Sequence, residues 1–147
     1  MQLFPWNPTE LLPHRPPMLL IDEIIDWGAQ HASAALTIRP DTLFLEGDRV
    51  PAHIGIEYMA QTCGAWAGAV ARESGLAPRR GYLLGARAFR WHRPAFLLGE
   101  RLVIGVRLTY RDAALGRFLG RIEIDGVLAA ESDLTVYEPP ENGELPA

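Results

Sequence analysis

One long apolar segment, residues 54–71, dominates the pattern of hydrophobic and polar positions, and it contains a single charged side chain, Glu57. Glycine and alanine recur along the whole segment. Pro51 suits the first position of a helix, and Gly75 is a typical C-terminal stop. The pattern therefore predicts a helix from Pro51 to about Ser74. A helix that is apolar on every side must be buried all round.

Shorter runs flank this segment, and some alternate between apolar and polar residues with the period of a half-buried strand. The predicted strands are residues 18–27, 31–38, 82–93, 100–111, 115–124 and 127–137. Asp125-Gly126 is a hairpin signal between the last two. A helical turn is expected at residues 7–12, and residues 41–49 are expected to form a loop. One buried helix and about six antiparallel strands indicate an α+β fold, in which a strongly curved sheet wraps around the helix.

Composition sets further limits. The chain has 147 residues, which fits one domain, and we expect that domain to span residues 1–138. Residues 139–147 are rich in proline, glutamate and glycine and are expected to form a flexible tail, because they offer little apolar area to bury. The formal net charge of −4 gives no reason to expect nucleic acid as a partner.

Missing residue types exclude several kinds of chemistry. Cys63 is the only cysteine, so no internal disulfide and no multi-thiolate zinc site can form, which suits a reducing cytoplasm. All 14 basic side chains are arginine, and this excludes Schiff-base catalysis and a Walker-type phosphate loop. The four histidines are scattered without suitably spaced carboxylates, so no metal site is expected. Neither a signal peptide nor a membrane span is expected, since Glu57 and Gln61 interrupt the apolar segment.

Three motifs resemble those of a known family. They are LPHRPPMLLIDEI from Leu12, FLEGD followed by PAHIGIEYMAQ from Phe44 to Gln61, and FRWHRPAFLLGERL from Phe89. In this order they resemble the hotdog-fold (3R)-hydroxyacyl-[acyl-carrier-protein] dehydratases. The GIEYMAQ helix is similar to that of a divergent subgroup of predicted dehydratases linked to aryl-polyene pigment clusters. The resemblance extends from about Leu11 to Tyr137 and implies a hotdog fold.

The sequence departs from this family at the catalytic base. The family has a histidine directly after the loop glycine, whereas Gly47 is followed here by Asp48. Only the family glutamate carries over by position, onto Glu57. The nearest imidazole is His53, and side chains four residues apart share a helix face. The positive helix N-terminus would keep that imidazole neutral, as a base requires.

The resemblance implies dehydration of a 3-hydroxyacyl thioester to a trans-2-enoyl thioester, without a metal or redox cofactor. His53 is our preferred base for the C2 proton, and Asp48 is the base by strict position, although aspartate is a weak base. Glu57 would protonate the departing 3-hydroxyl. Backbone N–H groups near Gly55 would polarise the thioester carbonyl, and Gln61 is also assigned to substrate binding. His14 is assigned a structural role.

Partners follow from the same resemblance. Arginines at 79, 80, 87, 90 and 93 form the one basic concentration. They are either a solvated strand face or a landing patch for an acyl-carrier protein and its phosphopantetheine, with Arg90 and Arg93 as substrate-side residues. Coenzyme A is the alternative carrier. A homodimer, or a heterodimer with another hotdog chain, is implied. Two other functions remain open, a non-catalytic subunit and a thioester hydrolase, because fold alone does not decide between them.

Overall fold

A computed structural model of the chain describes residues 6–78 and 81–139. In chain order the elements are α1 Pro8–Leu11, β1 Glu23–Gly28, β2 His31–Thr37, β3 Arg49–Pro51, the 3-10 turn η1 Ala52–Ile54, α2 Gly55–Glu73, β4 Tyr82–Trp91, β5 Ala95–Leu97, β6 Arg101–Asp112, β7 Leu115–Ile124 and β8 Val127–Tyr137. No helix in this described part is long and apolar enough to cross a membrane.

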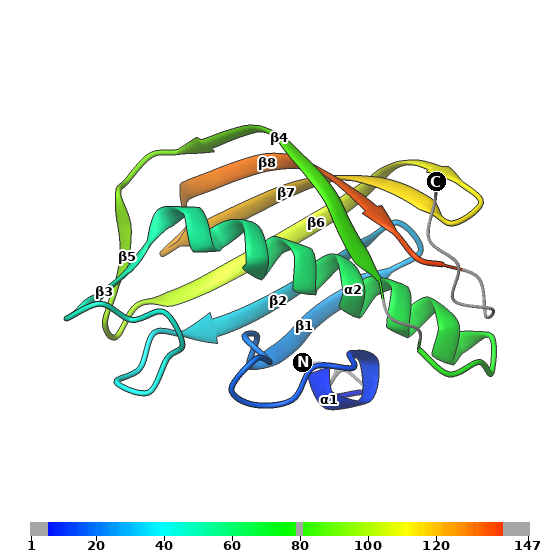
Figure 1. Cartoon of the computed structure of the whole chain (residues 1–147), viewed down its shortest axis with the longest axis horizontal. Coiled ribbons are helices and arrows are strands. Elements are labelled where there is room, and N and C mark those ends of the chain that lie inside the picture. The colour runs from blue at the N-terminus through cyan, green and yellow to red at the C-terminus, as the bar shows by residue number, and fades with distance from the viewer. Residues whose placement is uncertain (1–5, 79–80, 140–147) are drawn as a thin grey trace.

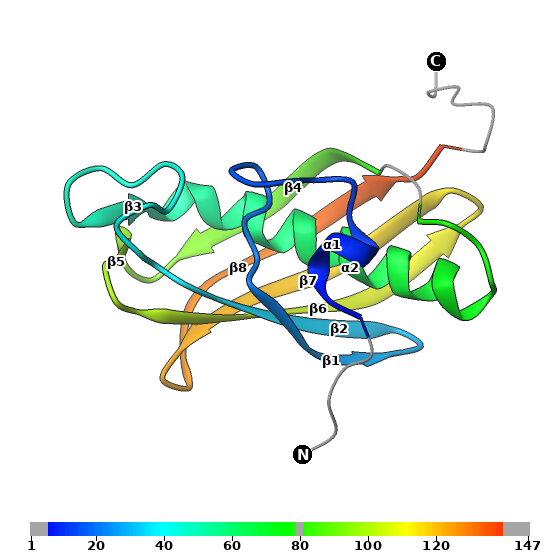
Figure 2. The same ribbon diagram turned by 90° about the horizontal axis from the view of Figure 1, so that it is seen from below.

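Six strands form one antiparallel sheet in the order β1-β2-β6-β7-β8-β4. Figure 1 shows α2 lying along the concave side of this sheet with α1 beside it, and α1 lies in front of α2 in Figure 2. The strands β3 and β5 pair separately beside the start of α2. The predicted α+β arrangement of a curved sheet around a long helix is therefore confirmed.

The core lies between α2 and the inner face of the sheet. On α2 the side chains of Tyr58, Met59 and Trp66 are buried there. Gly120 on β7 lets the helix approach closely, since a Cβ atom at that position would lie 2.6 Å from the sulfur of Met59. Burying each such large side chain contributes about 1.5–3 kcal/mol. This packing fixes the rotation of α2 about its axis and decides which of its residues face away from the sheet.

The opposite side of α2 is only partly covered. Here α1 and the segment after it pack against the helix. Gly64 and Gly68 permit this contact: an added Cβ at Gly64 would lie 2.9 Å from Leu12 Cδ2, and one at Gly68 would collide with the carbonyl oxygen of Leu11. Glu57 remains exposed on this side. The expectation that the helix is buried on all sides is therefore wrong for the isolated chain.

Two predicted boundaries are wrong. The first strand begins at Glu23 and not at Met18, because the preceding backbone is engaged elsewhere: Met18 N–H donates to the carbonyl of Arg15, and Leu20 N–H to the side chain of Gln61. The α-helix begins at Gly55 rather than Pro51, since Pro51 ends β3 and a 3-10 turn follows. The short strands β3 and β5 were not predicted, and β3 takes Arg49 from the predicted loop.

Other local predictions are confirmed. Asp125 and Gly126 both have positive φ, at 52° and 76°, as the two-residue turn between β7 and β8 requires. Gly75 ends α2 with φ +73°, and Leu76 N–H donates to the carbonyl of Ala71. Of the predicted tail, Pro139 is described and buried. Residues 140–147, together with Arg79 and Arg80, lie outside the described residues.

Candidate active site

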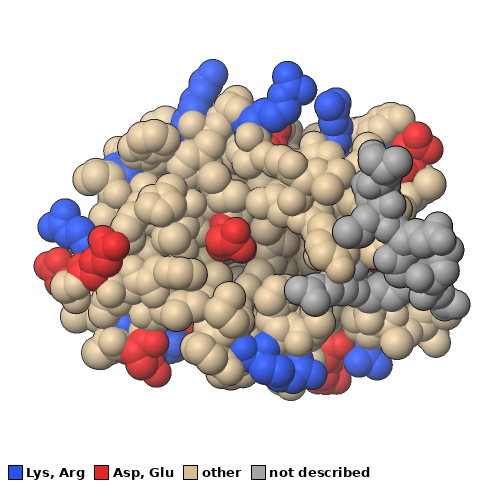
Figure 3. Space-filling model, viewed as in Figure 1, with Lys and Arg blue, Asp and Glu red and all other residues tan. Residues whose placement is uncertain are grey.

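A pocket opens on the side of α2 that faces away from the sheet. It encloses about 120 Å³ between the helix, the segment that follows α1 and the adjoining ends of β4 and β8. Its lining residues are Leu12, Pro13, His14, Glu57, Ala60, Gln61, Gly64, Gly81, Leu83 and Val136. In Figure 3, the middle of this molecular face is a hollow in otherwise uncharged surface, with a single acidic side chain in it. The pocket therefore combines apolar side chains with three polar ones, His14, Glu57 and Gln61.

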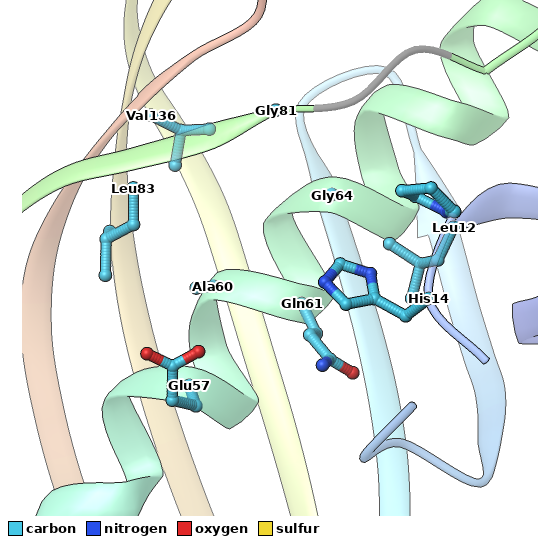
Figure 4. A pocket seen from close by; sticks show the side chains of 10 residues that line it. Leu12, His14, Glu57, Ala60, Gln61, Gly64, Gly81, Leu83 and Val136 are labelled. Atoms are coloured by element: carbon cyan, nitrogen blue, oxygen red, sulfur yellow. The ribbon is translucent and has the colours of Figure 1, made fainter. Parts of the chain in front are cut away.

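Glu57 supplies the carboxylate of this pocket. It is the third residue of α2, and its side chain points from the helix into the pocket (Figure 4). Within residues 6–78 and 81–139, no side chain or backbone group donates a hydrogen bond to this carboxylate. Ala60, one turn further along the helix, leaves open space beside it. The carboxylate is thus placed to meet a bound molecule.

His14 lines the same pocket from the segment after α1. Figure 4 shows its imidazole on one side of the pocket and the Glu57 carboxylate on the other. The sequence interpretation gave His14 only a structural role. The Leu-Pro-His-Arg motif was the available signal, but a spacing of 43 residues does not reveal that two side chains share a pocket.

Gln61 also lines the pocket, but both atoms of its amide are engaged. Its Oε1 accepts a hydrogen bond from Leu20 N–H at 2.8 Å, and its Nε2 donates to the Met18 carbonyl at 2.7 Å. The side chain is 5% exposed. Gln61 therefore ties the N-terminal segment to α2, and its predicted part in substrate binding stays a prediction.

The two candidate bases lie away from this pocket. His53 is exposed in η1 and is not among the lining residues. A 3-10 turn advances by roughly 120° per residue rather than about 100°, so His53 and Glu57 are less closely aligned than in a regular α-helix. Asp48 is exposed, and its Oδ1 lies 3.4 Å from Arg49 Nε. The structure does not bring either residue to Glu57 within one chain.

The predicted carbonyl-binding position, Gly55, faces the sheet. An added Cβ there would lie 2.9 Å from Ile122 Cδ1, and its backbone N–H already donates to the Ala52 carbonyl. This geometry does not support the predicted role. Gly55 nevertheless helps to orient the first turn of α2. Because Gly55 is buried against the sheet, Glu57 lies on the side of the helix that faces away from the sheet.

The two predicted substrate-side arginines differ. Arg93 forms a two-pronged ion pair with Glu100, at 2.9 and 2.6 Å, and also donates to the Ala95 carbonyl. These contacts hold the connection between β4 and β5. Arg90 is exposed on β4, so it is the one of the pair that is accessible to a partner.

Two reactive side chains of α2 face the core instead. Burial raises the pKa of Tyr58 to about 12, and the charge of Asp22 adds to the effect. Burial also raises the pKa of the Cys63 thiol, which is fully enclosed. Neither group is therefore available as a base or nucleophile at neutral pH. Among the described residues, no group of three or more His, Cys, Asp or Glu side chains is placed to hold a metal ion.

The chain is similar to known dehydratases over most of its length. The family model of the ApeP-like proteins, described as ApeP dehydratase, matches residues 6–146. The chain is 29% identical over 130 residues to the 3-hydroxyacyl-[acyl-carrier-protein] dehydratase FabZ of Anaeromyxobacter dehalogenans (strain 2CP-C), covering 84% of this chain and 83% of the relative. It is 32% identical over 140 residues to FabZ of Agrobacterium fabrum, covering 90% and 87%.

Solved structures give the same result. A chain of the Dehydratase Heterocomplex ApeI:P from Xenorhabdus doucetiae superposes with a TM-score of 0.89 and 33% identity, covering 93% of each chain. A hypothetical thioesterase with coenzyme A from Streptococcus pneumoniae TIGR4 has a TM-score of 0.63 and 13% identity, covering 80% of this chain and 84% of that one, and shows the fold alone. The chain therefore belongs to the ApeP-like family of hotdog-fold dehydratases.

Proposed function

We propose that this chain dehydrates 3-hydroxyacyl thioesters carried on an acyl-carrier protein, with Glu57 as the general acid. One observation carries the proposal: a carboxylate without a hydrogen-bond donor among the described residues points into a pocket that is partly lined by apolar side chains. Functional carboxylates occur in such surroundings because a ligand supplies the missing contact. The curated relatives are named for this reaction.

In the proposed reaction a base removes a proton from C2, and the electron pair of that bond forms the C2=C3 double bond. The C3–O bond breaks, and the leaving hydroxyl takes the proton of Glu57 and departs as water. The product is a trans-2-enoyl thioester. Among the described lining residues there is no arginine. For this step Glu57 has to carry the proton when the substrate is bound.

His53 and Asp48 stay the bases predicted from sequence. Because both are exposed and away from the Glu57 pocket of their own chain, either could act there only if a second chain brought it over the mouth. The edge strand β4 offers a place for that chain. One of its edges is unpaired in the sheet, and Leu84 and Trp91 on it are 51% and 57% exposed. We propose that a second hotdog chain, identical or different, joins here.

A second candidate function has specific support. Asp48 stands where the resembling family has its histidine, and the similar Xenorhabdus protein is part of a heterocomplex. The chain would then be a subunit that becomes active, or supports activity, only with a different hotdog chain. The acyl chain's length, the carrier and the cytoplasmic location are predictions under either candidate.

The test uses purified chain and a 3-hydroxybutyryl group on acyl-carrier protein, with the enoyl product followed by mass. We expect Glu57→Gln to keep the thermal midpoint and to lower the rate on the order of 10²–10⁴-fold, the usual contribution of a general acid. Glu73→Gln, at the exposed end of the same helix, is the matched control and should keep the wild-type rate. An unchanged rate in Glu57→Gln would refute the role. Wild-type protein that is inert alone but active with a second hotdog chain would establish the subunit candidate.

A further inference from the structure

A second, smaller pocket lies further along α2 than the Glu57 pocket, and we refer to it as the distal pocket. It encloses about 30 Å³ between the second half of the helix and the neighbouring ends of β6, β7 and β8. Its lining includes Trp66 and Ala67 from the helix and Phe118 from β7. Among the described lining residues only Val136, on β8, belongs to both pockets. Val136 therefore forms a wall between the two spaces.

The side chain of Val136 lies on the face of the sheet that α2 covers. It is partly buried and packs against the core, as does Leu83, its partner in the pairing of β4 with β8. Figure 4 shows both side chains on the strand side of the Glu57 pocket, opposite the helix. The partner of Val136 on β7 is Gly116, which has no side chain and lines the distal pocket. The isopropyl group of Val136 is therefore the bulk that separates the two pockets on the sheet.

The far wall of the distal pocket is aromatic and held in place. Trp66 and Phe118 meet edge to face, with ring centroids 5.5 Å apart, and both residues are 4% exposed. The indole Nε1 of Trp66 donates to the Gly28 carbonyl at 3.1 Å. The guanidinium of Arg111 lies 5.5 Å from the centre of the same indole. Such a wall accepts an apolar chain end but sets a fixed limit to its length, because close-packed aromatic side chains do not yield.

The cavity volumes define the length of acyl chain that each space can hold. An apolar cavity of roughly 150 Å³ accepts benzene, which has six carbon atoms. By this measure the 120 Å³ of the Glu57 pocket accommodates about five carbons. In the proposed reaction Glu57 acts at C3 while the carrier stays outside, so the pocket holds the chain from C2 onward. An acyl group of about six carbons therefore fills it.

We propose that Val136 is a specificity-determining residue of this site: it ends the Glu57 pocket at about six acyl carbons and closes off the distal pocket. This inference rests on the proposed dehydration of 3-hydroxyacyl thioesters. It names short-chain acyl groups as the substrate class. It concerns only the far end of the acyl chain, so it does not depend on which residue is the base.

The decisive variant is Val136→Ala. It vacates the space of two methyl carbons and joins that space to the 30 Å³ of the distal pocket, which together accommodate about three further carbons. On acyl-carrier protein, wild type should use 3-hydroxybutyryl and 3-hydroxyhexanoyl groups and lose efficiency with the 3-hydroxyoctanoyl group. Val136→Ala should raise kcat/KM for the octanoyl relative to the butyryl group roughly 15-fold, because each of two newly buried methylenes contributes about fourfold.

Two further variants complete the comparison. Val127→Ala makes the same substitution on the same strand, at a 68% exposed position that lines neither pocket, and should keep the wild-type profile of chain lengths. Val136→Leu adds bulk to the wall and should lower kcat/KM for the hexanoyl relative to the butyryl group. It also tests the assignment if Val136→Ala does not fold.

The outcomes separate this inference from the proposed function. If wild type dehydrates none of these acyl groups, alone or with a second hotdog chain, the proposed function fails. If wild type is active and both Val136 variants keep its profile of chain lengths, dehydration stands and the assignment of Val136 is wrong. A wild type that prefers octanoyl to hexanoyl groups would also overturn it.

A binding experiment tests the wall even where nothing is dehydrated. Wild type and Val136→Ala are titrated with 3-hydroxyacyl-pantetheines of the same chain lengths in a calorimeter. The affinity of wild type should stop rising at the hexanoyl group, and that of Val136→Ala at the octanoyl group. Identical dependence on chain length in the two proteins would show that Val136 does not limit the pocket.

Discussion

The contact between α2 and the N-terminal segment can be tested by adding one methyl group at either of two glycines. At Gly68 the new Cβ of Gly68→Ala would collide with the carbonyl oxygen of Leu11, which is backbone and has no rotamer to change. At Gly64 the nearest atom to the Cβ of Gly64→Ala is Leu12 Cδ2, at 2.9 Å, the end of a flexible side chain. The first change therefore has to move the segment, and the second does not.

The magnitude follows from three contributions. Replacing glycine by alanine inside a helix stabilises it by about 0.8–1.0 kcal/mol, and this gain is common to both variants. Overpacking of a rigid contact costs about 1–3 kcal/mol. Complete detachment of the segment would expose Leu11 and Leu12, which are now 1% and 4% exposed. Since that exposure would cost roughly 3–6 kcal/mol at about 1.5–3 for each leucine, the segment should shift and remain attached.

We therefore expect Gly68→Ala to be less stable than Gly64→Ala by about 1–3 kcal/mol, with a thermal midpoint roughly 3–10 °C lower. Urea unfolding of both variants, followed by circular dichroism, measures the difference between their free energies of unfolding. The helix stabilisation by alanine is common to both variants and cancels in this difference. Equal stabilities, or a more stable Gly68→Ala, would show that the close approach of Leu11 to α2 is not as described. Dehydratase rates of the two folded proteins then report whether a shifted segment also misplaces His14.

Two further predictions concern partners. Leu84→Arg should weaken the proposed pairing of two chains along β4 and shift the complex toward monomer in sedimentation. Leu119→Arg, at a 48% exposed position on β7, should not. A wild-type chain that is monomeric at micromolar concentration, alone and with a second hotdog chain, would contradict the proposed pairing. Arg90→Glu should raise KM for a carrier-bound substrate by about 2–5-fold, or ~0.4–1 kcal/mol, without changing KM for the pantetheine thioester. Arg121→Glu on β7 is its control, and an equal effect on both substrates would exclude a carrier-docking role for Arg90.

Features with local signals could be predicted from sequence. The strands at 115–124 and 127–137 were located at their observed bounds, because alternation and the Asp125-Gly126 turn are encoded within the strands and the turn themselves. The long helix was found because apolar residues continue over five turns. The first strand was placed too early, since what removes Met18 from the sheet is a hydrogen bond from Gln61, 43 residues away.

The candidate site could be predicted only in part, for a related reason. Glu57 was found because it is the single charge in an apolar helix, a feature visible along the chain. Its partner in the pocket was sought on the same helix, at His53. Residues four apart on a predicted helix can be inferred to lie close together from the sequence alone, whereas residues far apart in the chain cannot. The imidazole that shares the pocket comes instead from residue 14, and tertiary packing brings it there. The 3-10 turn that separates His53 from Glu57 has no clear sequence signal.

The packing around α2 explains its many small residues, which composition alone did not. Positions 57, 60, 61, 64 and 68 follow one another at helical spacing on the side away from the sheet or at its border. Glu57 supplies the carboxylate, and Ala60 is the small side chain that leaves space beside it. The amide of Gln61 binds the N-terminal backbone, and Gly64 and Gly68 allow that segment to approach the helix closely. A large side chain at Ala60 would fill the space between His14 and Glu57, and one at Gly64 or Gly68 would displace His14. The absence of a hydrophobic period along the helix is thus explained by two different neighbours: the sheet selects large apolar residues on one side, and the pocket with its attached segment selects small ones on the other.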